Sequence, residues 1–230
     1  MKTTASKYGM RLLVCVLLAA TAGSATAGPD RDGGTGVAKA SVRIFADSAA
    51  GPIKELNGGN LAPPLMDEEM PGCDIRESFS RLNIPITRLH DAPLENAGMR
   101  VVDIPLIFAN FHADANDPRN YYFDQTDDYI RNCVASGTQV YYRLGTSIEH
   151  SRNKYFTAPP SDAGKWIDVV SNVIRHYTEG KWNGYRYDIE YWEIWNEPDL
   201  GPKMWTGTLE AFNDFYATAA RELKKRFPHL

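Results

Sequence analysis

The sequence predicts an α/β fold, because strand-like and helix-like segments alternate along the chain. Short runs rich in β-branched and aromatic residues are bounded by Gly, Pro and Asn. Between these runs lie longer segments in which apolar residues recur every three or four positions, as on one face of a helix. Strand and helix follow one another four times between residues 53 and 230. Since helices that join successive strands form right-handed crossovers, we expect a parallel sheet, either open and doubly wound or closed into a barrel.

The first expected elements lie before residue 91. Residues 42–46 alternate between apolar and polar side chains, which is typical of a strand, and a second strand is expected over 53–61. The apolar positions of the helix that follows are Ile75, Phe79 and Leu82. Pro85 separates this helix from a further strand over 86–90.

The remaining segments continue the alternation. In chain order we expect a long loop over 93–120, a helix from Asp124 to Gly137, a strand over 139–144, a helix over 161–180, a strand over 189–195 and a helix from Thr208. Asp124 is a suitable N-cap, and Gly137 is a suitable residue just beyond a helix end. The helix over 161–180 has the clearest helical spacing, with Trp166, Val169, Val170, Val173, Ile174 and Tyr177 on its apolar face.

Composition and turn sequence exclude several classes of function. The 230 residues include 25 Lys+Arg and 29 Asp+Glu, a formal charge of −4, with no basic run that would bind nucleic acid. The turn Asn57-Gly58-Gly59-Asn60 lacks the G-x-G-x-x-G spacing of a dinucleotide loop and leads toward Pro63-Pro64, not into a helix. We therefore expect neither a nucleic-acid partner nor a nucleotide cofactor.

The N-terminus has the features of a signal peptide over residues 1–27. An apolar run over 12–20 is followed by the small residues of a cleavage site at 25–27. The positively charged residues before this run are Lys2, Lys7 and Arg11. The run is shorter than the roughly 20 residues that span a bilayer. We expect a secreted or periplasmic protein with no membrane segment after cleavage.

After cleavage, residues 28–40 form a Gly-rich linker and residues 41–230 form the folded domain. Two cysteines remain, Cys73 and Cys133. Export permits a disulfide between them, while the helical spacing of Cys133 favours two buried thiols, and both alternatives stay open. No C-x-x-C pair or histidine cluster accompanies them, so no metal is expected.

The end of the strand over 189–195 carries the residues that point to function. It reads Trp195-Asn196-Glu197-Pro198, so a carboxyl group and an amide follow an apolar strand directly. In barrels of parallel strands, the residues at the carboxyl ends of the strands face the substrate. Glycoside hydrolysis needs a carboxylic acid to protonate the leaving oxygen, and a neighbouring amide can hold a sugar hydroxyl. Glu197 and Asn196 fit these two roles.

The Trp-Asn-Glu-Pro sequence resembles the fourth strand end of retaining glycosidases built on the (β/α)8 barrel. With the segment Asn120-Tyr121-Tyr122-Phe123-Asp124-Gln125-Thr126-Asp127, then Arg143-Leu144-Gly145 and His176-Tyr177, the chain is similar to glycoside hydrolase family 39, the β-xylosidase and α-L-iduronidase group. The resemblance covers residues 51–230. It implies the first half of a (β/α)8 TIM barrel, about four strand–helix units, and a xyloside or related sugar as substrate.

The resemblance also implies roles for individual residues. It makes Glu197 the general acid/base, Asn196 the partner of the sugar 2-hydroxyl and His90 a substrate contact. Asp91 stands where the family's xylosidases have Gly, which leaves the identity of the sugar open. The alternative for His90 is a histidine satisfied by the backbone at the strand end. His150, in the loop after the third strand, is either a subsite residue or a support for the loop.

Glu193 shares the strand parity of Glu197 but lies deeper in the expected barrel. A carboxylate removed from water needs a partner, so we expect an ion pair with Arg88 or Arg143.

Four strand–helix units provide an acid/base residue but not a nucleophile, which in this group follows the seventh strand. We therefore expect a chain that is the N-terminal portion of a glycosidase and is inactive alone. The alternative is a non-catalytic carbohydrate-binding half-barrel. Either protein would have an oligo- or polysaccharide as its partner, and neither would need a cofactor.

Overall fold

The computed structural model describes residues 41–45, 47–48, 51, 57–61, 75–90 and 100–230, in two units that divide after Gly51. In the first unit, Val42 and Ile44 are 85% and 83% exposed and the described residues form no strand. The strand expected over 42–46 is therefore wrong for 42–45, because alternation forms a strand only where a neighbouring strand pairs with it. The predicted signal peptide, the linker, Cys73 and Asp91 lie outside the described residues.

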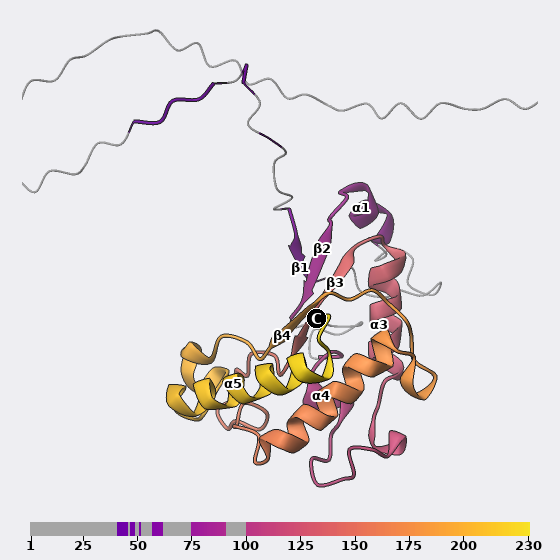
Figure 1. Cartoon of the computed structure of the whole chain (residues 1–230), viewed down its shortest axis with the longest axis vertical. Helices are drawn as coiled ribbons and strands as arrows, with labels where there is room; N and C mark the ends of the chain where they lie inside the picture. Colours follow the sequence, from indigo (N-terminus) through magenta and orange to yellow (C-terminus); the bar gives the residue numbers. More distant parts are fainter. Residues whose placement is uncertain (1–40, 46, 49–50, 52–56, 62–74, 91–99) are drawn as a thin grey trace, which may run out of the picture. The chain divides into compact units, whose positions relative to one another are not determined.

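The second unit contains a parallel sheet of four strands in the order β1-β2-β3-β4 (Figure 1). The strands are β1 (Gly59–Asn60), β2 (Ile86–Leu89), β3 (Gln139–Leu144) and β4 (Tyr191–Ile194). Each strand is hydrogen-bonded to the one that follows it along the chain. An open doubly wound sheet reverses its strand order at a switch point, whereas a (β/α)8 barrel keeps one direction. The sequential order therefore favours the barrel.

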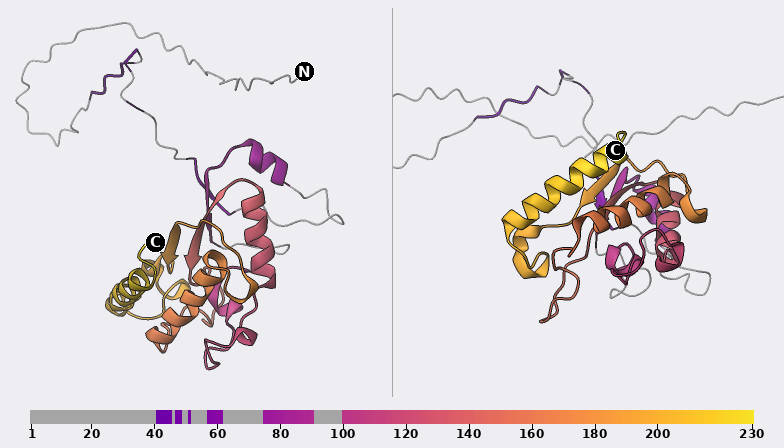
Figure 2. Two further views of the ribbon diagram at one scale, coloured as in Figure 1. Left: turned by 45° about the vertical axis from the view of Figure 1, so that its right-hand side comes forward. Right: turned by 60° about the horizontal axis from the view of Figure 1, so that its bottom comes forward.

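Helices connect the strands, but one of them, Ile104–Ile107, lies within the stretch over 93–120 that was expected to be a loop. The helices are α1 (Arg76–Arg81), α2 (Ile104–Ile107), α3 (Asp124–Ala135), α4 (Ala163–Thr178) and α5 (Leu209–Arg226), with short 3₁₀ turns at Pro118–Asn120, Lys181–Asn183 and Pro198–Lys203. Ile75 and Leu82, expected on the apolar face of the first helix, flank that helix instead and are 48% and 67% exposed. Figures 1 and 2 show α3, α4 and α5 gathered on one side of the sheet. Among the described residues, no helix is long and apolar enough to cross a membrane.

The core lies between this side of the sheet and the helices. Alternate residues of β3, Val140, Tyr142 and Leu144, face it and are buried. All six residues predicted for the apolar face of α4 are buried as well, and so is Cys133 of α3. Because the strand period of two places every second side chain on this side, the intervening residues of β3 are left for the opposite face.

The helix over 161–180 is slightly shorter in the structure than predicted, and one predicted N-cap is wrong. Asp162 caps α4 by accepting a hydrogen bond from the Lys165 N–H (2.9 Å), and Thr208 caps α5 through the Ala211 N–H (3.1 Å). Asp124, predicted as an N-cap, is instead the first residue of α3. The carboxylate still lies in the first turn, where the helix dipole stabilises it.

Candidate active site

The backbone turns sharply where β4 ends. Trp195 and Glu197 both have positive φ angles, 67° and 34°, which are rare for residues with side chains. The turn is held by hydrogen bonds from the Trp195 N–H to the Leu144 carbonyl (2.7 Å) and from the Trp195 indole Nε1 to the Met204 carbonyl (2.7 Å). A Cβ at Gly145 would lie 3.0 Å from the Trp195 Cα, so glycine permits the close approach of the two strand ends. This turn fixes the positions of the residues that follow Trp195.

Arg88 of β2 binds two residues at the end of β4. Its Nε and Nη2 each lie 2.7 Å from an oxygen of Glu193, which makes a bidentate ion pair, and Nη2 also donates to Oδ1 of Asn196. The hydrogen bond to Glu193 raises the pKa of Arg88 above its ordinary value, although burial opposes this. The ion pair expected for Glu193 is therefore confirmed, with Arg88 as the partner.

Asn196 is buried and its orientation follows from its partners. Because Oδ1 accepts from Arg88, the Nδ2 amino group faces the other way, 3.2 Å from Oε2 of Glu197 and 3.7 Å from Sδ of Met204. Glu197 itself is exposed at the carboxyl end of the sheet. The arrangement thus places an oriented amide donor next to an accessible carboxylate.

The two predicted histidines lie at different places. His90 directly follows β2 and is half-buried, so it lies at the same edge of the sheet as Asn196 and Glu197. His150 is exposed in the loop after β3, where it lines a cavity that Glu197 does not line. Within the described residues, no hydrogen bond or ion pair joins His150 to the Asn196–Glu197 pair, and Asp91 lies beyond the described part of the chain.

Sequence reasoning missed a buried ion pair between Arg143 and Asp103. Nη2 of Arg143 lies 2.5 Å from Oδ1 of Asp103, and the two side chains are 0% and 3% exposed. Asp103 also accepts hydrogen bonds from the backbone N–H (2.7 Å) and the hydroxyl (2.8 Å) of Ser147. The pair therefore fixes the start of the loop after β3. Arg143 was recognisable as an inward strand residue, but Asp103 lay in a stretch expected to be a loop.

Glu149 is a second buried carboxylate that the sequence did not single out. It accepts hydrogen bonds from the backbone N–H groups of Tyr155 (2.8 Å) and Phe156 (3.0 Å) and from the Ser151 hydroxyl (3.0 Å). Burial alone would raise the pKa of this carboxyl, but these hydrogen bonds and nearby Lys154 outweigh it, so the pKa lies below its ordinary value. Glu149 thus fixes the aromatic pair in the loop.

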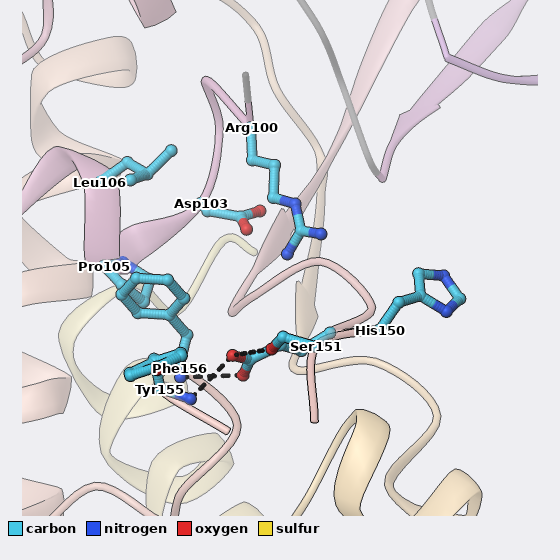
Figure 3. A pocket seen from close by; sticks show the side chains of 9 residues that line it. Arg100, Asp103, Pro105, Leu106, His150, Ser151, Tyr155 and Phe156 are labelled. Carbon is cyan, nitrogen blue, oxygen red and sulfur yellow. Dashed lines mark hydrogen bonds between the residues drawn. The ribbon is translucent and has the colours of Figure 1, made fainter. Parts of the chain in front are cut away.

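A cavity of about 310 Å³ lies beside this loop (Figure 3). Its lining residues are Arg100, Asp103, Pro105, Leu106, Glu149, His150, Ser151, Tyr155 and Phe156. In Figure 3 the Arg100 side chain extends toward the space between Asp103 and Ser151, whereas His150 points away from Tyr155 and Phe156. In the part of the chain that the structure describes, no three His, Cys, Asp or Glu residues are grouped to hold a metal ion.

Comparison with known proteins identifies a family and similar sequences. Residues 105–230 match the family described as Glycosyl hydrolases family 39. A β-xylosidase from Geobacillus stearothermophilus is 31% identical over 108 residues, which cover 44% of this chain and 18% of that protein. A β-xylosidase from Caldicellulosiruptor saccharolyticus is 28% identical over 102 residues, or 42% and 18%. The matched region thus spans less than a fifth of these curated relatives.

Solved structures show the same fold. A glucosidase from Croceicoccus marinus superposes with a TM-score of 0.59 and 27% identity, over 77% of this chain and 36% of that one. A monomeric β-xylosidase from Caulobacter crescentus CB15 gives a TM-score of 0.52 at 20% identity, over 80% and 37%, and supports the fold alone. The four-stranded parallel sheet is therefore part of a (β/α)8 barrel. Since the family match includes more than half of the residues, the chain belongs to glycosyl hydrolase family 39.

Proposed function

We propose that the native gene product is an exported retaining glycosidase in which Glu197 is the general acid/base. Its substrate is a xyloside or related sugar in an oligo- or polysaccharide. The observation that carries this proposal is the pairing of an exposed Glu197 with a buried, oriented Asn196 at the carboxyl end of β4. The β-xylosidase names of the two curated relatives support the choice of sugar.

Glu197 would act twice in such a reaction. As a carboxylic acid it donates its proton to the glycosidic oxygen as the bond to the sugar breaks, and as a carboxylate it then accepts a proton from the attacking water. The exposure of its side chain leaves room for the leaving group and for water. The nucleophile that forms the covalent intermediate in retaining enzymes is a second carboxylate, roughly 5 Å from the first.

Asn196 would hold the sugar during this reaction. Arg88 occupies its carbonyl oxygen, so the group that can turn to substrate is the Nδ2 amino group, a donor that lies against Glu197 and the Met204 sulfur in the structure. In glycosidases, hydrogen bonds to the 2-hydroxyl strengthen in the transition state, and a bond from this amino group would therefore favour the transition state over the ground state.

The test is substitution of Glu197 by Ala in the native gene product. Without a proton donor, hydrolysis of natural xylosides, which have poor leaving groups, falls by about 10²–10⁴-fold, and activated aryl glycosides are less affected. Added azide then restores the rate on aryl substrates and yields a glycosyl azide of unchanged anomeric configuration. Glu210→Ala, which removes an exposed carboxylate of α5, is the control. Equal losses on both substrates without azide rescue would contradict the role of Glu197.

A further inference from the structure

We propose that the cavity in Figure 3, called here the Arg100 pocket, binds the carboxylate of an acidic sugar unit such as a uronic acid. The proposal deepens the function proposed above and rests on it, because it assumes that the substrate is an oligo- or polysaccharide. The Arg100 pocket is lined by its polar residues Arg100, Asp103, Glu149, His150 and Ser151, its aromatic residues Tyr155 and Phe156, and Pro105 and Leu106. Its role would be to recognise a substituent beyond the sugar whose bond is cleaved.

Within the described residues, the charges of the Arg100 pocket leave Arg100 as an uncommitted cation. Asp103 is neutralised by Arg143, with its oxygens also bound by Ser147. Glu149 accepts four hydrogen bonds and lies near the ammonium group of Lys154. By contrast, the half-buried Arg100 guanidinium makes no hydrogen bond or ion pair with any side chain in the described ranges. The excess charge of the pocket is therefore positive.

A guanidinium with its donors free suits a carboxylate. Its planar N–H groups match the two oxygens of a carboxylate, and such charge-assisted pairs are stronger than neutral hydrogen bonds. The two carboxylates in the wall have their lone pairs occupied by protein donors, so they offer little to a cationic ligand. The pocket thus selects for an anion.

The walls of the pocket indicate that the anion is carried by a ring. Tyr155 and Phe156 are 68% and 43% exposed and their rings lie 6.4 Å apart, although aromatic rings are usually buried. Their backbone N–H groups are held by Glu149, which makes the aromatic surface a fixed feature of the loop. Burying exposed aromatic surface against the apolar face of a ligand stabilises the complex. A sugar with a carboxyl group provides both the apolar ring face and the anion.

The pocket is fixed relative to the end of β4. The Ile104 N–H donates to the carbonyl of Gly145 (2.9 Å), and Gly145 is the residue against which Trp195 packs. The Glu149 N–H donates to the carbonyl of Lys203 (2.8 Å), in the 3₁₀ segment directly after Glu197. The loop that forms the pocket is thus bound on both sides to the residues around the proposed acid/base. One branched oligosaccharide is expected to occupy both places.

Calorimetric binding to the native gene product tests this proposal. The background is Glu197→Gln, so that the ligands are not consumed. The probes are xylotriose and xylotriose with a glucuronic acid branch. We expect the affinity for the acidic probe to exceed that for the neutral one by about 10-fold or more. A hydrogen bond to a charged group provides a difference of this size. The preference should shrink at 1 M salt, where the Debye length is about 3 Å.

Two variants locate the effect. In Arg100→Gln, the ratio of the two affinities should fall to about one, whereas Arg152→Gln should keep it. Arg152 is an exposed arginine of the same loop that does not line the pocket, so this control makes the same change in net charge. The proposal is overturned if both variants lose the preference for the acidic probe equally, or if Glu197→Gln itself shows no preference. In either case, binding of the neutral probe would leave the proposed glycosidase function intact.

Two further outcomes separate the remaining explanations. If acetate at equal concentration displaces the acidic probe as effectively as free glucuronate does, the pocket binds anions without recognising a sugar, and the proposal is wrong. If neither trisaccharide binds while the protein is folded by circular dichroism, the oligosaccharide function itself is contradicted.

Discussion

At the scale of single residues, Arg88 determines how Asn196 is presented. The side chains of Arg88 and Glu193 are 26% and 23% exposed, so this pair lies at an accessible edge rather than deep in the core. A pair so placed contributes modestly to stability. Its consequence for function is geometric, since the guanidinium that binds Glu193 also occupies Oδ1 of Asn196. The strand parity of Glu193 predicted an ion pair. That the same arginine also binds Asn196 could not be predicted, because it depends on how β2 and β4 approach one another across β3.

Replacing Asn196 by Asp tests this presentation. The substitution keeps the shape of the side chain but removes the donor, and it places a second carboxylate beside Glu197. We expect kcat and kcat/KM on xylosides to fall together by about 100-fold, since hydrogen bonds to the 2-hydroxyl supply several kcal/mol in the transition state.

The matched control uses the substrate rather than a second variant. On a 2-deoxy substrate, which lacks the hydroxyl, the native protein and Asn196→Asp should differ by only a few-fold in steady-state rates. An equal loss on both substrates would mean that Asn196 acts through the fold or through Glu197, not through the sugar.

At the scale of elements, local periodicity predicted regular structure well and loops poorly. The bounds of β3 agree with the expected 139–144, and α4 buries all six predicted residues, because each pattern extends over several periods. The pattern around Val42 is as regular, yet no strand forms at 41–45. The buried carboxylates Asp103 and Glu149 were missed because their partners are backbone N–H groups and distant side chains. Sequence spacing contains no signal for such contacts.

The loop held by Glu149 leads to a prediction about pH. Its folded-state pKa lies below the ordinary value of 4.5, so the carboxylate stabilises the folded protein above pH 4.5. That contribution is lost as the pH falls through the lower folded-state value. The melting temperature of the native protein should therefore decrease between pH 5 and pH 3 more steeply than that of Glu149→Gln. Parallel decreases would show that Glu149 does not hold the loop through its charge.

At the scale of the molecule, the described sheet has four strands, and within the described residues β4 pairs only with β3. Tyr191 of β4 and Tyr216 of α5 are 48% and 47% exposed beside this edge. No described element covers the exposed part of Tyr216. An unpaired strand edge with exposed aromatic residues is a site for association with other strands. This chain covers 36% and 37% of the two solved relatives. Those proteins therefore contain further residues that can pack against such an edge.

The same geometry predicts the behaviour of these 230 residues when they are expressed alone. Glu193, four residues before Glu197 on β4, is bound bidentately by Arg88 and is therefore not free to attack a sugar. Retaining hydrolysis requires two carboxylates with separate roles. We expect the isolated chain to associate through the β4 edge, as measured by light scattering, and to release no aryl group from an aryl xyloside above the uncatalysed rate. Tyr191→Lys should reduce the association by placing a charge on the edge strand. Steady turnover by the isolated chain that disappears in Glu193→Gln would instead make Glu193 the nucleophile, and the Arg88 pair would then be a resting arrangement that substrate displaces.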